Sequence, residues 1–592
     1  MPGSASVDRH TDRWLAGSPV YLADLDRCLP ADAMNPAPAL RRWRALPFTA
    51  EACAGTMLLA GPETAAPDVT YPLDVAGWHA ISIGVYAETH GESRALRARL
   101  TGEPSFTYLA THPDEGTFQA EHLLERFWKI ADLTDRQIEL GQISPRVGSG
   151  DEAGSFVCTP ANIAYIKLVP LSPAEVEAHL ADEARTDRRR VFAHNDAHGY
   201  IWNGGPLTVE EIQREVAPFA DSDVARIYWE GAVGDLTFYP SAIGHMPTAD
   251  GVEDFIRVGD HTHARAWRHF RDEGIDPLRI AAETAQSIGI ELHASYRVAG
   301  FHFAAPIYDS WNAGGFYLDH PELRCVTRDG NAAPRLSYAY PETRELVISL
   351  LREMASYPVD GVALLFNRRP PLLEYEQPLV EGFQAQFGVD PRTLDERDER
   401  WLRYRAEFLT TFMRELRTGL DATDKELGRK RPTQISAVVL SSEAENLYRA
   451  IDLRTWVAEG LVDTVIPYSS APNLDSGAEA WGDPESIEFF INLVSGTDCV
   501  LAPNLMPRYV PPAELRRGAR QLYDAGVTHF FAWDAVVLGG RVMFNDYWDA
   551  LRRLGHRDEI AAWSDAGEPS LGSTTMRLLT LGDWDMSYAT PG

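Results

Sequence analysis

The sequence predicts an α/β protein in which an all-β sandwich domain precedes a (β/α)8 TIM barrel. Three observations support this prediction. The chain has 592 residues, enough for two or three domains. Its front part shows apolar residues at every second position, a pattern typical of half-buried antiparallel strands. From about residue 190 onward, short apolar runs alternate with amphipathic helical patterns, which is the signature of parallel βα units.

The front part divides into two segments. Residues 1–50 are rich in Pro and Ala and have few periodic runs, so we expect an irregular leading segment. Residues 51–175 are predicted to form a jelly-roll-like β-sandwich, because Ile81, Ile83 and Val85 alternate with small or polar residues between turn signals. Ser172 stands before a helical pattern and is a good N-cap, so it marks the end of the sandwich.

Residues 176–555 are predicted to form the barrel, because eight strand-like runs can be counted in them. These runs are 191–196, 225–231, 290–296, 359–366, 433–443, 462–468, 498–504 and 528–535. A doubly wound open sheet is the rival fold, but no Gly-rich dinucleotide turn follows any run. Residues 556–592 form a predicted C-terminal β extension, which either returns to the sandwich or makes a small appendage.

Composition excludes several kinds of partner. The chain has 55 Lys and Arg against 86 Asp and Glu, a net charge of −31, so nucleic acid and anionic membranes would be repelled. The five cysteines have no C-x-x-C pair, and no signal peptide or stretch of ~20 apolar residues is present. We therefore expect a cytoplasmic protein without disulfides. Homo-oligomerisation stays open, because an amphipathic pattern does not separate core from interface.

Active sites of such barrels lie at the carboxyl ends of the strands, so the residues there are the site candidates. Carboxylates, amides, guanidiniums and tryptophans gather at these ends, which is the inventory of a carbohydrate site. The candidate catalytic pair is Glu443 and Asp534, with Glu376, Glu374, Asp196 and Glu230 in reserve. The candidate substrate-binding residues are His194, Asn195, Trp229, Arg297, Arg368, Tyr468, Asn504 and Trp533.

Two of these assignments have other interpretations. Glu443 follows Ser442 at the start of a helical pattern, so it could instead serve the first turn of that helix. His194, Asp196 and His198 have the spacing of a metal-ligand run, although short H-x-D-x-H runs often arise by chance.

The middle of the chain resembles the glycoside-hydrolase-like barrel family that is related to family-ten glycosidases. The matching residues are His320, Pro321, Glu322, Gly330, Pro341, Glu342, Arg344, Tyr357, Asp360, Gly361, Arg368 and Pro370. The resemblance is clearest over residues 290–420, and the β-rich front is similar to the accessory sandwich domains of such enzymes. One position departs from the family pattern, which places an Asp in the fourth strand where this chain has Leu365.

The residues and the resemblance together imply a glycoside hydrolase. We expect it to cleave an oligosaccharide or small glycoside with two carboxylates and without a cofactor. Two alternatives stay open. The Leu365 departure would suit a non-catalytic carbohydrate-binding barrel, and the run from His194 to His198 would suit a metal-dependent hydrolase or lyase.

Overall fold

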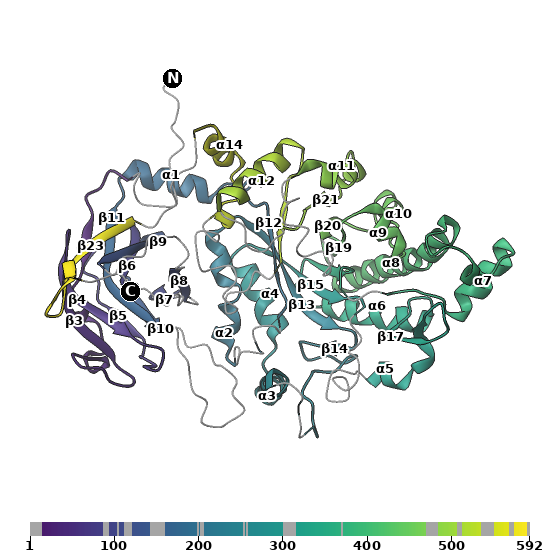
Figure 1. The fold of residues 1–592 in the computed structure, drawn as a ribbon, viewed down its shortest axis with the longest axis horizontal. Coiled ribbons are helices and arrows are strands. Elements are labelled where there is room, and N and C mark those ends of the chain that lie inside the picture. Colours follow the sequence, from purple (N-terminus) through teal and green to yellow (C-terminus); the bar gives the residue numbers. More distant parts are fainter. Residues whose placement is uncertain are drawn as a thin grey trace. The chain divides into compact units, whose positions relative to one another are not determined.

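The chain folds into two compact units in a computed structural model. The first unit consists of residues 1–189, 203–205 and 536–592, and the second of residues 190–202 and 206–535 (Figure 1). The structure describes residues 15–86, 94–103, 106–111, 121–142, 160–197, 201, 207–252, 255, 258–299, 315–368, 371–468, 483–505, 512–533, 550–566 and 574–588.

The first unit is built from two sheets whose strands pair antiparallel, except for the parallel pair of β2 and β3. The larger sheet has the order β2-β3-β4-β11-β6-β9-β23-β24 with β1 beside β11, and the smaller has the order β5-β10-β7-β8. The larger sheet contains β1 (Val20–Leu22), β2 (Met34–Asn35), β3 (Trp43–Ala50), β4 (Ala54–Ala60), β6 (Trp78–Tyr86), β9 (His122–Asp132), β11 (Ala161–Pro170), β23 (Thr574–Leu581) and β24 (Trp584–Asp585). The smaller contains β5 (Val69–Tyr71), β7 (Arg94–Leu100), β8 (Thr107–Thr111) and β10 (Ile138–Gln142).

Apolar side chains from both sheets pack into one core. Ile81 and Ile83 of β6 lie in it with Leu96 and Leu100 of β7 and Leu140 of β10. Each of these side chains is at most 3% exposed. The alternation that predicted strands around Ile81 therefore marks a real strand of the β-rich unit.

The leading segment departs from expectation, whereas the C-terminal tail follows one of the two expected courses. Residues 1–50 were expected to be irregular, yet β1, β2 and β3 lie there, and β3 pairs with β4 over six residues. The tail returns to the larger sheet, because β23 pairs antiparallel with both β3 and β9. Period-2 patterning in β3 is interrupted by Pro47 and by exposed positions, so the sequence signal was weak there.

The two helices of the first unit are α1 (Pro173–Glu183) and α14 (Arg557–Ala566) among the described residues. Ser172 caps α1 as expected: its hydroxyl accepts from the Glu175 N–H while the Glu175 side chain accepts from the Ser172 N–H. The barrel was expected to span 176–555, but α1 and residues 536–555 belong to the first unit.

The second unit holds a nearly closed barrel of eight parallel strands in chain order. Each of the eight predicted runs overlaps one strand. They are β12 (Val191–Asn195), β13 (Val224–Val233), β15 (Glu291–Arg297), β18 (Gly361–Leu365), β19 (Gln434–Leu440), β20 (Thr464–Tyr468), β21 (Val500–Leu501) and β22 (Phe530–Ala532). β22 pairs with β12, and beyond β21 the Phe531 N–H donates to Pro503 at 3.0 Å while the Leu505 N–H donates to Phe531 at 2.8 Å.

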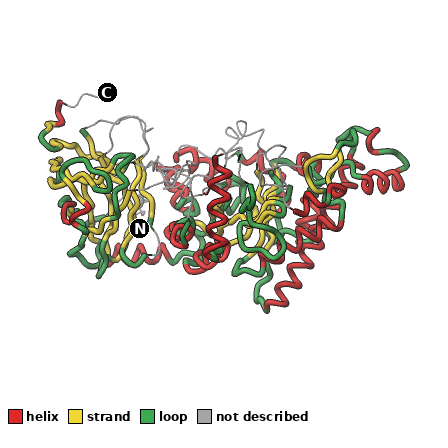
Figure 2. The backbone as a smooth tube through the Cα atoms, turned by 90° about the horizontal axis from the view of Figure 1, so that it is seen from below, coloured by secondary structure: helices red, strands yellow, loops and turns green. Residues whose placement is uncertain are grey.

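Helices connect these strands and lie on their outside, as Figure 2 shows in red around yellow strands. They are α2 (Val209–Gln213), α3 (Val258–Glu273), α4 (Pro277–Ser287), α5 (Gly315–Asp319), α6 (Pro341–Ala355), α7 (Gln377–Phe387), α8 (Glu399–Leu427), α9 (Glu443–Tyr448), α10 (Leu453–Ala458), α11 (Glu488–Val494) and α12 (Pro512–Asp524). Short strands β14 (Leu236–Thr237), β16 (Arg324–Val326) and β17 (Ala332–Leu336) lie in the connections. Within the described ranges, no helix combines the length and the apolarity needed to cross a bilayer.

Side chains at alternate strand positions fill the barrel. Phe192 of β12, Tyr228 of β13 and Leu365 of β18 share one cluster with residues of β19, β20 and β22. Successive side chains of a strand point to opposite faces. The residues two positions further along β12 and β13 therefore also face the interior, and this parity decides which predicted site residues reach the mouth of the barrel.

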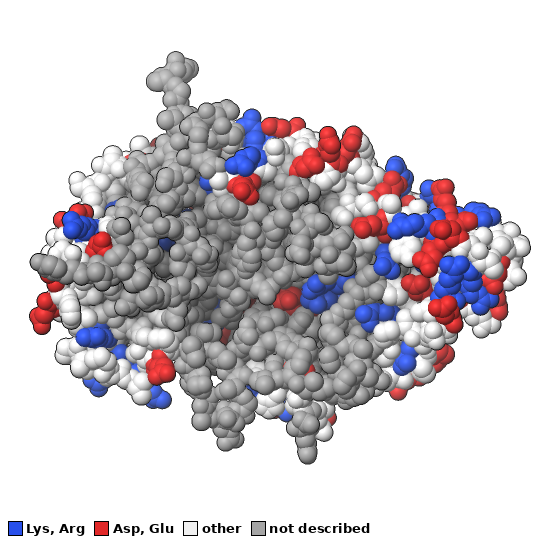
Figure 3. Space-filling model, in the orientation of Figure 1, with Lys and Arg blue, Asp and Glu red and all other residues white. Residues whose placement is uncertain are grey.

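Charged side chains mix on the surface of the second unit. In Figure 3, blue and red atoms intermingle over the end that carries α7 and α8 in Figure 1. At the start of α8, Arg400 pairs with Asp398 at 2.6 Å and Arg403 with Glu399 at 2.8 Å. The acidic excess of the chain is thus locally balanced in this region.

Candidate active site

The mouth of the barrel gathers an aromatic group around Trp533, which directly follows β22. The His194 ring stacks on the Trp533 ring with centroids 4.0 Å apart and 13° between planes. Tyr468 meets the same ring edge-on at 5.0 Å, and the Arg368 guanidinium carbon lies 5.3 Å from its centroid. Four predicted substrate-binding residues therefore lie together, and they come from four different strand ends.

A second group at the mouth is a buried acid held by a guanidinium. Glu230 of β13 is fully buried, and its Oε2 accepts from the Arg297 Nε at 2.7 Å. The Arg297 Nη2 lies 3.8 Å from Oδ2 of Asp196, whose side chain is 21% exposed. Arg297 of β15 thus joins a carboxyl group within β13 to the carboxylate that directly follows the neighbouring β12.

Burial sets the protonation of this acid. It raises the pKa of Glu230 from its ordinary value to about 8, and the nearby charge of Asp196 raises it further, while Arg297 and Arg368 lower it. The removal of the carboxylate from water raises this pKa more than the two guanidiniums lower it. Glu230 therefore keeps its proton at neutral pH, which is the state required of a general acid.

Several buried polar groups at the strand ends have no hydrogen-bond partner among the residues that the structure describes. Leaving such groups unpaired costs about 1–3 kcal/mol each, so a cluster of them points to a ligand that completes them. They are the side chains of Ser295, Asn367, Tyr468, Asn504 and Trp533. The predicted set lacked Ser295 and Asn367. Ser295 lies two positions before Arg297 in β15, so both side chains are on the same face of the strand. This spacing could have identified Ser295 from the sequence.

Two predicted binding residues do not reach the mouth. Asn195 is adjacent to His194 and so lies on the other face of β12. Its amide donates to Glu215 at 3.2 Å and accepts from the Ala197 N–H at 2.8 Å, so it shapes the turn that carries Asp196. Trp229 likewise has the opposite parity to Tyr228 and Glu230, and it is fully buried. Both predictions overlooked strand parity.

The predicted catalytic pair is not assembled by the described residues. Glu443 is the first residue of α9, its side chain is 43% exposed, and both of its oxygens accept from Arg454 at 2.5 and 3.0 Å. The helix-start interpretation of Glu443 is therefore correct and the catalytic one is not supported. Asp534 lies outside the described residues, as does His198.

The reserve acids Glu374 and Glu376 serve the connection between β18 and α7. Glu376 is buried at the N-cap of α7, and its carboxylate accepts from the backbone N–H groups of Val326 and Glu374. Burial raises the pKa of both acids, and Arg405 partly offsets it for Glu374. The hydrogen bonds of the Glu376 carboxylate attach this connection to Val326 of β16, so we assign Glu376 a structural part.

Replacing Glu443 with Gln is expected to change the free energy of unfolding by less than about 1 kcal/mol, because an exposed ion pair contributes little. Thermal unfolding of the variant and the wild type measures this. A loss of several kcal/mol would show that the Glu443–Arg454 pair is more than a surface contact.

A potential metal site lies elsewhere than expected. The described residues contain one group close enough to share an ion, namely Asp182, His556 and Glu559 in the first unit. Arg553 already pairs with Asp182 at 3.3 Å and with Glu559 at 2.6 Å, and His556 lies 3.2 Å from Asp182. A guanidinium thus occupies the place where a cation would neutralise these acids.

Comparison with known proteins gives one family and several similar folds. Residues 257–496 match the model of the family described as Glycosyl hydrolase-like 10, which confirms the resemblance read from the sequence. No curated protein matches the chain.

Similar solved structures are glycoside hydrolase domains with low sequence identity. The glycoside hydrolase domain of PgaB (BpsB) from Bordetella bronchiseptica is 13% identical, with a TM-score of 0.39 over 60% of this chain and 98% of that one. The catalytic domain of a β-amylase from Paenibacillus polymyxa is 11% identical, with a TM-score of 0.39 over 64% and 98%. An endo-β-1,4-mannanase from Thermotoga petrophila is 11% identical, with a TM-score of 0.37 over 63% and 77%.

Proposed function

We propose that the chain is a glycoside hydrolase that cleaves an oligosaccharide or small glycoside with Glu230 as general acid and Asp196 as second carboxylate. The enzyme would be a (β/α)8 TIM barrel with an accessory β-sandwich. The observation that carries the proposal is the pairing of a buried acid, whose pKa is about 8, with a partly exposed carboxylate across Arg297. Two carboxyl groups in different environments are what glycosidic cleavage requires.

Arg297 orients the acid. A guanidinium can only donate, so Oε2 of Glu230 acts as the acceptor and the proton resides on Oε1. From there it passes to the glycosidic oxygen as the bond to the anomeric carbon breaks. Arg297 then faces a full carboxylate on Glu230, and this ion pair stabilises the product of proton transfer.

Asp196 supplies the second half of the reaction. It either attacks the anomeric carbon or takes a proton from an attacking water, depending on whether the carboxyl groups are ~5–5.5 or ~6.5–9.5 Å apart with substrate bound. Its partial exposure keeps it within reach of solvent and of a sugar at the mouth.

The remaining residues at the mouth are suited to bind the hydroxyl groups and the ring of a sugar. Tyr468, Asn367 and Asn504 present buried donors and acceptors for hydroxyl groups. The stacked rings of His194 and Trp533 are rigid and aromatic, and the Trp533 indole N–H offers a donor beside them. This combination favours a neutral polyhydroxylated substrate over an apolar one.

A second candidate function is carbohydrate binding without cleavage, and Leu365 is the observation that favours it. Leu365 is fully buried in the barrel core, where the family pattern has an Asp. It pairs in register with Arg297 of β15, so both side chains lie on one face. In this chain the carboxyl group beside Arg297 is Glu230 of β13 instead. The proposal of catalysis therefore requires Glu230 to replace the missing Asp of the fourth strand.

Hydrolysis of a panel of nitrophenyl pyranosides and furanosides of both anomers tests the proposal. We expect the wild type to release nitrophenol from one sugar, and Asp196→Asn to lower kcat/KM by ~10³-fold or more. A wild type that binds sugars by calorimetry but releases nitrophenol from none would support the binding protein. Full activity of Asp196→Asn would remove Asp196 from the mechanism.

A further inference from the structure

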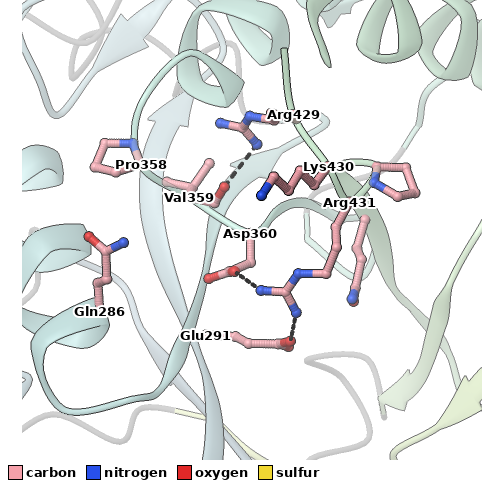
Figure 4. Close-up of a pocket in the computed structure, with 10 residues that line it drawn as sticks. Gln286, Glu291, Pro358, Val359, Asp360, Arg429, Lys430 and Arg431 are labelled. Atoms are coloured by element: carbon pink, nitrogen blue, oxygen red, sulfur yellow. Dashed lines mark hydrogen bonds and ion pairs between the residues drawn. The ribbon is translucent and has the colours of Figure 1, made fainter. Parts of the chain in front are cut away.

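A polar pocket opens at the amino-terminal ends of the barrel strands, at the opposite end from the mouth. Its volume is about 300 Å³, at the lower limit of small-molecule sites. The first residue of β15, the turn before β18 and the segment between α8 and β19 form its walls. Its principal polar residues are Gln286, Glu291, Asp360, Arg429–Arg431 and Gln434 (Figure 4).

The two carboxylates of this pocket are already engaged. Glu291 receives two N–H bonds from the buried Arg226, at 3.0 and 2.8 Å, and lies 3.9 Å from Arg431. Asp360 accepts from the Leu292 N–H at 3.0 Å and lies 3.5 Å from Arg431. Figure 4 shows Arg431 reaching both carboxylates. A ligand would therefore meet carboxylates that are already paired with guanidiniums.

Arg429 shapes the pocket without being available to a ligand. Its guanidinium donates to the carbonyl oxygens of Ala355, Tyr357 and Val359, at 2.5, 2.7 and 2.9 Å. It also lies 3.7 Å from Asp424. These hydrogen bonds connect the segment after α8 to the turn before β18, and so fix the shape of this wall of the pocket.

Several hydrogen-bond donors of the pocket, in contrast, have no partner among the described residues. Lys430 lines the pocket, is exposed, and has no ion-pair partner in the described part of the chain. The side-chain nitrogens of Gln286 and Gln434 likewise have no hydrogen-bond partner among the described residues, although the Gln434 oxygen accepts from Arg226 at 2.6 Å. Arg431 adds a guanidinium whose side chain is 78% exposed.

We propose that this pocket binds a small oxyanion, a phosphate or carboxylate group, with Lys430 as its charge partner and the amides of Gln286 and Gln434 as further donors. Surplus donors beside engaged carboxylates select an acceptor-rich ligand, and an ammonium selects a negative one. The volume admits a group the size of a monosaccharide that carries one such anion. This inference is independent of the proposed hydrolysis at the other end of the barrel.

Ligand-observed NMR at low ionic strength tests the site with four probes: inorganic phosphate, glucose 6-phosphate, glucuronate and neutral glucose. We expect at least one anionic probe to bind, and Lys430→Gln to weaken it at least about fivefold. Lys425→Gln is the matched control. It removes the same charge from an exposed position of α8 that does not line the pocket, and should leave binding unchanged.

The pattern across probes identifies the anion. Binding of both phosphate probes but not glucuronate assigns a phosphate group, and the reverse assigns a carboxylate. Failure of all anions to bind at up to about 10 mM, far above the affinity of a built site, overturns the proposal. Binding that Lys430→Gln leaves unchanged, or equal binding of neutral glucose, overturns it as well.

Discussion

Replacing Glu230 with Gln is expected to reduce hydrolysis of a glycoside with a poor leaving group, such as an oligosaccharide, by ~10³-fold or more. Gln retains the shape of the side chain and an oxygen acceptor for Arg297 but has no proton to give. A nitrophenolate leaves without protonation, so nitrophenyl glycosides should lose at least ~10-fold less activity than oligosaccharides. Asp196→Asn should harm both substrates alike, because Asp196 takes part in the attack on the anomeric carbon, as nucleophile or as base, whichever group leaves.

Glu443→Gln is the matched control for that experiment, since it makes the same chemical change on an acid paired with Arg454 at the surface. It should leave kcat/KM unchanged for both substrates. An equal loss for both substrates in Glu230→Gln would contradict proton donation by Glu230, and full activity would contradict any part for it in catalysis.

The Glu230→Gln variant also tests how Glu230 affects the pH dependence of stability. The folded pKa of Glu230, about 8, lies above its ordinary value of 4.5, so the folded state holds the proton more tightly than the unfolded state. The stabilisation from this proton is complete below pH 4.5 and is lost as the pH rises through 8. The wild type should therefore lose stability relative to Glu230→Gln over this window, by about 1.4 kcal/mol per unit.

Replacing Arg297 with Met is expected to shift the alkaline limb of the pH profile upward by at least about one unit. Arg297 lowers the pKa of Glu230 through its charge and its hydrogen bond, so its removal leaves burial unopposed and raises that pKa above 8. The acid stays protonated over a wider range but becomes a weaker donor, and kcat should fall ~10²-fold or more.

The pH dependence of kcat/KM for the wild type and Arg297→Met measures this shift. Arg297→Lys is the informative companion, because it keeps the charge without the two-nitrogen geometry. In Arg297→Lys the alkaline limb of the pH profile should stay near that of the wild type, while kcat should still fall. A limb that moves to lower pH in Arg297→Met would contradict the direction of the electrostatic coupling.

The fold was largely predictable because it depends on local patterns. Strand-like runs of six to eleven residues predicted all eight barrel strands, including the two-residue β21, and Ser172 predicted the start of α1. The return of β23 to the larger sheet was not decided, because pairing between residues 574–581 and 43–50 is a contact between distant segments that no local pattern encodes.

The site was predictable in part. The strand-end rule found His194, Arg297, Tyr468 and Trp533, which meet at the mouth. It also selected Asn195, Trp229 and Glu443, since it takes no account of side-chain parity or of helix starts. Glu230 was in reserve only, because its raised pKa follows from complete burial and from the approach of Asp196, neither of which is visible along one strand.

The central claim is that Glu230 keeps its proton at neutral pH, and an infrared difference spectrum tests it most directly. Protonated and ionised carboxyl groups absorb at separate frequencies, and subtracting the Glu230→Gln spectrum from that of the wild type isolates this one group. We predict a protonated carboxyl band at pH 6 that converts to a carboxylate band as the pH passes about 8. A carboxylate band already present at pH 6 would contradict the account.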